Sequence, residues 1–445
     1  MIKFHFFSRV LILLFFIGNC SYFSKESNDN TKNLTLAALA LRNSTSTTTY
    51  PIVDTNQTTC YSFSTGAVVT CTGTGYDADY TRNSPSYTKN SAGTIITDNV
   101  TGLMWTQTAD IDGNGTLNSS DKKSQTNAIA YCDALTTGGY TDWRLPDIKT
   151  LYSLIQFSGK DASSDSTCST AGSTACVTSS LTPFLSSTFD WAFGDVSANE
   201  RVIDAQYATS TTYTSTTMNN NATMFGVNFI DGRIKGYPKT IVSTGADNTF
   251  YVRCVRGNTS YGVNNFVSNG DTISDYSTGL MWQTADADST SFDNAISICE
   301  AATTSNYSDW RLPNAKELQS IVDYTRSPAY TSSAAIDSKF TATSITNENG
   351  QTDYAYYWSS STHIQNDSTG KYGVYVSFGR AVGYMNSTYY DVHGAGAQRS
   401  NYKQDVNTTS GVSSATLNNN VFYYHGPQGD ILRANNKVRC VRTLF

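Results

Sequence analysis

Apolar residues recur at helical spacing after two Leu-Pro pairs, Leu145-Pro146 and Leu312-Pro313. The positions that share one helical face are Ile148, Leu151, Tyr152 and Ile155, and then Ala315, Leu318, Ile321 and Val322. Asp147 and Asn314 stand where a helix N-cap is expected, and Glu317 follows Asn314 in the register of a capping box. The pattern predicts a helix after each Leu-Pro pair.

Other segments predict two more helices, a strand and a tight turn. Residues 127–135 and 294–302 indicate short helices, each with a cysteine on its apolar face. Apolar residues alternate over 374–378 as in a strand, and Asp231-Gly232 is a tight-turn signal. Two helices followed by a strand-rich half predict an α+β domain.

The same sequence words appear twice in the same order. The first copy contains Thr-Gly-Leu-Met-Trp at 101–105, Asp-Trp-Arg-Leu-Pro at 142–146 and Val-Arg-Cys-Val-Arg at 252–256. The second copy repeats them at 278–282, 309–313 and 438–442. Self-similarity of this kind indicates a duplicated unit. We therefore predict two tandem domains, residues 50–257 and 258–445.

The start of the chain has the features of an export signal. A basic region with Lys3 and Arg9 precedes an apolar run, Val10 to Ile17, that is too short to span a bilayer. The run ends in Ile17-Gly18-Asn19-Cys20, which resembles a relaxed form of the lipobox of bacterial lipoproteins. The resemblance implies a signal peptide over 1–20 and a lipid on Cys20, and ordinary secretion is the alternative.

Composition and charge indicate where the chain is located and which partners it does not bind. Residues 21–49 are mostly polar and rich in Ser, Thr and Asn, which predicts a flexible tether. Ser21 lacks the carboxylate that retains some lipoproteins at an inner membrane, so we expect an outer-membrane anchor and a position at the cell surface. The net charge of −6 argues against nucleic acid as a partner, because polyanion binding needs a basic face.

The cysteines predict a disulfide framework. With Cys20 set aside, eight of the nine cysteines remain, an even number in an oxidising compartment. One cysteine pair occurs at equivalent positions in both copies: Cys132 with Cys254, and Cys299 with Cys440. We therefore expect the first helix of each copy to be linked to its last strand. Cys60 with Cys71 and Cys168 with Cys176 are left as short local bridges.

The repeated words together resemble the C-terminal domain family of the Legionella collagen-like adhesin, and both copies match. The resemblance implies a C-type-lectin-like α+β fold and attachment to glycans or extracellular matrix. The second copy has Tyr357-Trp358-Ser359-Ser360 where the first has Tyr207-Ala208-Thr209-Ser210. We expect Tyr357 and Trp358 to line a ligand site in the second copy.

An insertion in the first copy, residues 110–121, fits a calcium loop. Side-chain oxygens come from Asp110, Asp112, Asn114 and Asp121, and a backbone carbonyl comes from Thr116. The competing interpretation is a solvated loop, because Asp, Asn and Gly are also ordinary turn residues. The second copy lacks the insertion, so we expect calcium to have a structural role.

Two classes of function remain. The favoured one is a non-catalytic surface adhesin that binds a host glycan or a matrix protein. Its rival is an enzyme on a C-type-lectin-like scaffold related to formylglycine-generating enzymes, which need reactive cysteines. A calcium-dependent sugar lectin is weakened by the absence of the Glu-Pro-Asn and Gln-Pro-Asp motifs. We expect the first copy to stiffen the base and the second to do more of the binding.

Overall fold

Each copy of the repeat begins and ends in one four-stranded antiparallel sheet. The computed structural model describes residues 48–444 except 219, 242 and 405–410. The two sheets have the orders β3-β4-β5-β9 and β10-β11-β12-β25. Their strands are β3 (Tyr87–Lys89), β4 (Ile95–Asp98), β5 (Met104–Thr106), β9 (Val255–Arg256), β10 (Phe266–Ser268), β11 (Thr272–Asp275), β12 (Leu280–Gln283) and β25 (Val441–Thr443). Trp105 on β5 and Trp282 on β12 are fully buried, so the first repeated word supplies core residues.

The predicted helices are confirmed in both copies. They are α2 (Gln125–Asp133), α3 (Ile148–Tyr152), α4 (Phe292–Glu300) and α5 (Ala315–Ser320). Asp147 caps α3 by accepting from the backbone N–H of Thr150, and Asn314 with Glu317 forms a capping box on α5. The disulfides Cys132–Cys254 and Cys299–Cys440 link α2 and α4 to the residues directly before the last sheet strands, β9 and β25, and confirm the predicted pairs.

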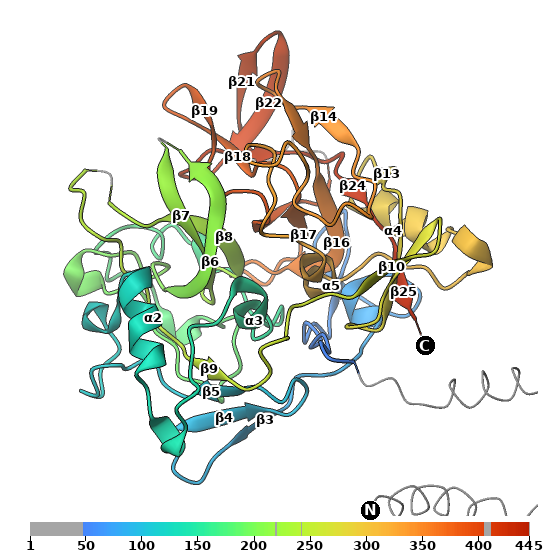
Figure 1. The fold of residues 1–445 in the computed structure, drawn as a ribbon. Helices are drawn as coiled ribbons and strands as arrows, with labels where there is room; N and C mark the ends of the chain where they lie inside the picture. The colour runs from blue at the N-terminus through green and yellow to red at the C-terminus, as the bar shows by residue number, and fades with distance from the viewer. Residues whose placement is uncertain (1–47, 219, 242, 405–410, 445) are drawn as a thin grey trace, which may run out of the picture. The chain divides into compact units, whose positions relative to one another are not determined.

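Both copies contribute to one eight-stranded sheet with the order β13-β24-β16-β17-β20-β8-β7-β6 (Figure 1). The first copy supplies β6 (Gln206–Thr217), β7 (Asn221–Asn228) and β8 (Arg233–Pro238). The second supplies β13 (Ala287–Asp288), β16 (Tyr356–His363), β17 (Tyr372–Ser377), β20 (Gln398–Tyr402) and β24 (Lys437–Val438). The copies meet where Gln398 of β20 pairs with Ile234 of β8. We call this junction the seam.

A second sheet belongs to the later copy alone. Its five strands have the order β19-β18-β23-β22-β21, and they lie at the top of Figure 1. They are β18 (Val382–Met385), β19 (Thr388–Asp391), β21 (Ser413–Leu417), β22 (Asn420–His425) and β23 (Asp430–Leu432). The remaining elements are β1 (Cys60–Tyr61), β2 (Val68–Val69), β14 (Ser344–Thr346), β15 (Thr352–Tyr354), η1 (Asp77–Asp79), η2 (Ser119–Asp121), η3 (Thr137–Gly139), η4 (Ala162–Ser164), η5 (Thr178–Ser180), η6 (Val196–Ala198) and η7 (Thr304–Asn306). The described chain is thus mostly sheet with few short helices, an α+β fold.

The two copies share a core. Buried residues of the first copy, such as Leu151, and of the second, such as Leu318, belong to one hydrophobic cluster. Two lysines at equivalent positions cross the boundary in opposite directions. Lys149 Nζ donates to the Ser320 carbonyl at 2.6 Å, and Lys316 Nζ donates to the Ser153 carbonyl at 2.9 Å. The described residues from 48 to 444 accordingly belong to one compact unit, and the predicted boundary at 257/258 falls between β9 and β10.

The first arginine of the repeated Val-Arg-Cys-Val-Arg sequence bonds the backbone at the end of β5 in the first copy and of β12 in the second. Arg253 and Arg439 are both 0% exposed. Arg253 Nη1 donates to the carbonyls of Thr106 and Gln107 at 2.6 and 2.8 Å, and Arg439 Nη1 donates to that of Gln283 at 2.9 Å. Because an arginine can satisfy several carbonyls at once, these side chains order the ends of β5 and β12.

Some predicted segments lie outside the described residues. They are the signal peptide over 1–20, the lipidation site Cys20 and the tether up to residue 47. Within the part of the chain that is described, no helix combines the length and the apolar character needed to cross a bilayer.

Candidate ligand groove and metal-binding loop

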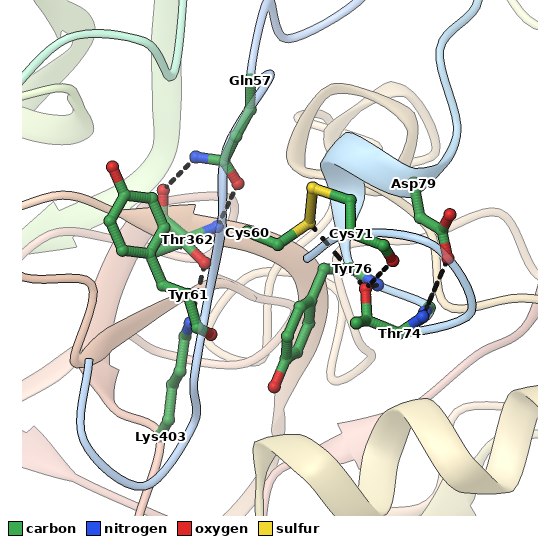
Figure 2. The surroundings of a disulfide bond; sticks show 10 residues. Gln57, Cys60, Tyr61, Cys71, Thr74, Tyr76, Asp79, Thr362 and Lys403 are labelled. Carbon is green, nitrogen blue, oxygen red and sulfur yellow. Dashed lines mark hydrogen bonds between the residues drawn. A yellow bond between two sulfur atoms is a disulfide. The ribbon is translucent and has the colours of Figure 1, made fainter. Parts of the chain in front are cut away.

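Residues 50–83 precede the first repeated word in the sequence and contact both copies, and we call them the strap. Gln57 makes two hydrogen bonds to the backbone of Thr362, one as donor and one as acceptor, both of 2.8 Å (Figure 2). Cys60 and Tyr76 belong to the hydrophobic cluster around α4 and Trp358. The strap is therefore an integral part of the second copy's packing.

A disulfide closes the strap into a hairpin. Cys60 and Cys71 are bonded, as predicted, and β1 pairs with β2 inside the loop (Figure 2). The hairpin rests on a turn of the second copy, where the Gly370 N–H donates to the Gly66 carbonyl at 2.9 Å. A Cβ atom on Gly370 would overlap the ring of Tyr61. This close backbone approach fixes the position of the hairpin.

A groove of about 810 Å³ lies at the seam, and we call it the seam groove. One wall comes from the hairpin, with Phe63 and Ser64, and another from the first copy, with residues 164–166. The rest comes from residues 365–372 and 402–404 of the second copy. The rings of Tyr372 and Tyr402 lie against each other with centroids 4.3 Å apart. The groove thus combines an aromatic surface with polar walls.

The first-copy and second-copy walls of the seam groove come from segments that are hydrogen-bonded to each other. The Asp161 N–H donates to the Ile364 carbonyl at 2.8 Å, and the Asn366 N–H donates to Ser164 Oγ at 3.0 Å. A second disulfide, Cys168–Cys176, closes the short loop that directly follows the first-copy wall, again as predicted. The Cys60–Cys71 disulfide therefore encloses one wall of the groove, whereas the loop closed by Cys168–Cys176 contributes no lining residue.

Buried charges lie beside the groove at the seam. Arg233 on β8 pairs with Asp161 at 2.6 Å, and although burial opposes it, Arg233 helps lower the pKa of Asp161 to about 2. His363, at the end of β16, stacks on Phe184 and is 0% exposed. Burial and the nearby Arg233 lower the pKa of His363 to about 4, so its ring is neutral at pH 7. These contacts tie the first copy's loop to the second copy's strand.

The insertion in the first copy brings three carboxylates together. Ligand oxygens of Asp110, Asp112 and Asp121 all lie within 4.8 Å of one another. Oδ1 and Oδ2 of Asp110 accept from the N–H groups of Gly113 and Gly115, both at 2.8 Å. Clustered carboxylate oxygens on a tightly turned loop are the donor set that a hard cation such as Ca²⁺ prefers.

The other predicted ligands of this loop lie on the same turn. Asn114 Oδ1 accepts from the Thr116 N–H at 2.7 Å, and the Thr116 carbonyl accepts a long bond of 3.5 Å from Asn118 Nδ2. Asp121 is buried, and its two oxygens accept from the N–H groups of Ile111 and Asn118 at 2.9 and 3.0 Å. The loop is thus closed end to end by its own carboxylates.

Comparison with known protein families gives a match in each copy. The family model of the Lcl C-terminal domain matches twice, over residues 94–256 and 271–393. The chain belongs to the Lcl C-terminal domain family. Membership indicates an adhesin-like surface protein. No curated protein and no solved structure matches the chain.

One predicted site in the second Lcl C-terminal domain needs correction. Tyr357 and Trp358 on β16 are 1% and 0% exposed, so they cannot offer a surface to a ligand. Trp358 Nε1 donates to the Ala434 carbonyl at 3.1 Å, and the Trp358 ring packs on Phe292. Aromatic residues suit a buried strand as well as a binding surface, and here they form the core of the domain.

The seam groove was not predicted from the sequence. Its walls come from the strap and from both Lcl C-terminal domains, and the strap precedes both matched segments. A weak signal was present, because the tripeptide Asp-Ser-Thr occurs on both main walls, at 165–167 and 367–369. It also occurs at 288–290, away from the groove, so the tripeptide alone does not identify a site.

Proposed function

We propose that the chain is a non-catalytic, lipid-anchored surface adhesin that binds a host glycan or an extracellular-matrix protein through the seam groove. The observation that carries the proposal is that the disulfide-closed hairpin 60–71 forms one wall of this groove, while the walls from the two copies are hydrogen-bonded to each other. Walls held in place before binding reduce the entropy lost on binding. A volume of about 810 Å³ also falls in the range of ligand pockets.

The chemistry of the seam groove suits this role. Tyr372 and Tyr402 are half-buried and offer ring surface, while Gln365, Asn366 and Gln404 offer amide donors and acceptors. Hydroxyl-rich ligands need both kinds of contact, because their C–H faces pack on rings and their hydroxyls require hydrogen-bond partners. A C-type-lectin-like scaffold is part of the same proposal.

Anchoring and calcium complete the proposal. A lipid on Cys20 would attach the chain to the outer membrane with its folded part at the cell surface. Replacing Cys20 with Ser should release the chain into the soluble fraction, and protease added to intact cells should cleave the wild-type chain. Calcium in the loop 110–121 would stabilise the first domain rather than contact the ligand, since this loop contributes no residue to the groove.

The binding proposal is tested on glycan and matrix-protein arrays, with and without calcium. The exported chain should bind a defined subset, and Tyr402→Ala should weaken that binding at least about tenfold, the effect of losing one good aromatic contact. Tyr330→Ala is the matched control, because its side chain is 68% exposed and outside the groove. Binding to nothing on either array, or equal loss in both variants, would overturn the proposal.

A further inference from the structure

The two main walls of the seam groove carry the same small turn. In the first domain, Asp165 Oδ1 accepts from the N–H and the hydroxyl of Thr167, at 2.8 and 2.7 Å. In the second domain, Asp367 Oδ1 accepts from the N–H and the hydroxyl of Thr369, at 2.9 and 2.7 Å. Each carboxylate keeps its other oxygen, Oδ2, outside these bonds. The groove therefore presents two fixed carboxylates, one from each domain.

Neither of these carboxylates has an ionic partner in the described chain. The bonds from Thr167 lower the pKa of Asp165, which is ionised at neutral pH. The third Asp-Ser-Thr sequence, away from the groove, differs in this respect, because Asp288 pairs with Lys437 at 2.6 Å. The only cation among the described lining residues is Lys371, while Lys160 at the edge donates to Ser368 Oγ. Among the described lining residues, two aspartates therefore stand against one lysine.

The remaining lining groups are uncharged. They are the amides of Gln365, Asn366 and Gln404, several hydroxyls and the rings of Phe63, Tyr372 and Tyr402. Such groups donate to and accept from ligand hydroxyls without demanding a charge. An anionic ligand placed between Asp165 and Asp367 would meet like charges, which is unfavourable and suppresses the wrong partner.

We propose that the seam groove takes an uncharged saccharide, and that Asp165 and Asp367 exclude sulfated and carboxylated glycans. This specificity rests on the proposed adhesin function and narrows it to one ligand class. Neither carboxylate is a catalytic group in this role. Each acts by its charge at the mouth of the groove, so an isosteric amide that keeps the turn should relax the specificity without removing neutral binding.

The test uses the exported chain on matched glycan pairs that differ only in a sulfate or a carboxylate. The wild type should bind the neutral member at least about tenfold more tightly. Asp165→Asn/Asp367→Asn should reduce this ratio by about tenfold while leaving neutral binding near its wild-type level. Asp247→Asn/Asp271→Asn, which changes two exposed aspartates outside the groove, is the control with the same charge change and should keep the ratio.

Other outcomes separate this inference from the function on which it rests. Tighter binding of the sulfated member by the wild type, or an unchanged ratio in the groove variant, would overturn the specificity while leaving the adhesin function standing. Stronger sulfate binding in calcium than in EDTA would also overturn it, since a bound cation would then mask the carboxylates. Absence of all glycan binding, with matrix protein still bound, removes the saccharide ligand class. Circular dichroism and disulfide mapping verify that both variants fold.

Discussion

Lys403 offers a sharp test of how the strap packs on the second domain. Its side chain is 0% exposed and lies under the strap, donating to Thr362 Oγ1 at 2.7 Å and to the Tyr61 carbonyl at 3.2 Å (Figure 2). Its Nζ is 4.9 Å from the ring centroid of Phe292 and 5.2 Å from that of Tyr76. Burial, with no carboxylate of the described chain opposing it, lowers the pKa of Lys403 to about 7.

This shift has a defined effect on stability. The pKa of a lysine in the unfolded chain is about 10.4. Between a folded pKa of about 7 and that value, the unfolded chain binds a proton that the native state does not bind. The free energy of unfolding therefore rises with pH across this window, by about 1.4 kcal/mol per pH unit. Over the three units from pH 7 to pH 10 the gain is about 4 kcal/mol.

The assay compares urea unfolding of the wild type and Lys403→Met near pH 7 and near pH 10. Relative to the variant, the wild type should gain about 4 kcal/mol on going to the higher pH. Tyrosine ionisation affects both proteins and cancels in the difference. Lys89→Met removes an exposed lysine and should run parallel to the wild type. A gap that does not change with pH would refute the reasoning, because the attraction of the two rings for the ammonium would then outweigh its desolvation.

Three further changes have expected outcomes. Calcium at a hundred times its dissociation constant should stabilise the wild type by about 2.7 kcal/mol in a thermal-shift assay, and Asp121→Asn should abolish the effect. Gly370→Ala should destabilise the chain by about 1–3 kcal/mol in urea, because its Cβ meets the Tyr61 ring, and a neutral result would mean that the hairpin moves freely. Burial, with the charge of Asp54 added, raises the pKa of Asp77 to about 7, above its unfolded value, so stability should fall as pH rises from about 4 to about 7. In Asp77→Asn that decline should be smaller than in the wild type, and the part that remains comes from groups such as Asp391, whose pKa burial also raises to about 7.

Local signals explain what the sequence predicted well. The caps at Asp147 and Asn314 and the apolar faces behind them depend on a few neighbouring residues, so the helices α3 and α5 were predictable. The disulfide pairs Cys132–Cys254 and Cys299–Cys440 are distant in sequence, yet the repeat identified them because equivalent residues in two copies must have equivalent partners. Comparing the two copies with each other thus identified cysteine pairs that are distant in sequence, which a single copy could not have revealed.

Long-range contacts explain what was missed. The seam groove joins Phe63 of the strap to Asp165 and Tyr372, segments separated by hundreds of positions and drawn from non-equivalent parts of the two domains. No repeat pattern can identify such a combination. Trp358 was assigned to the surface for a related reason, since an aromatic residue on a strand fits either face, and only the packing of Phe292 beneath it decides.

The expected division of labour between the domains also changes. The reciprocal bonds of Lys149 and Lys316 make each domain complete the environment of the other's helix end. A buried ammonium removed from its carbonyl partners would leave both unsatisfied, so neither half retains its native packing without the other. The strap extends this dependence, since it packs on both domains: the Gln57 amide donates to the carbonyls of Phe157 and Thr362. Functions are therefore better assigned to particular surfaces than to whole domains. The groove lies at the seam between the domains, and the metal-binding loop is the insertion at 110–121.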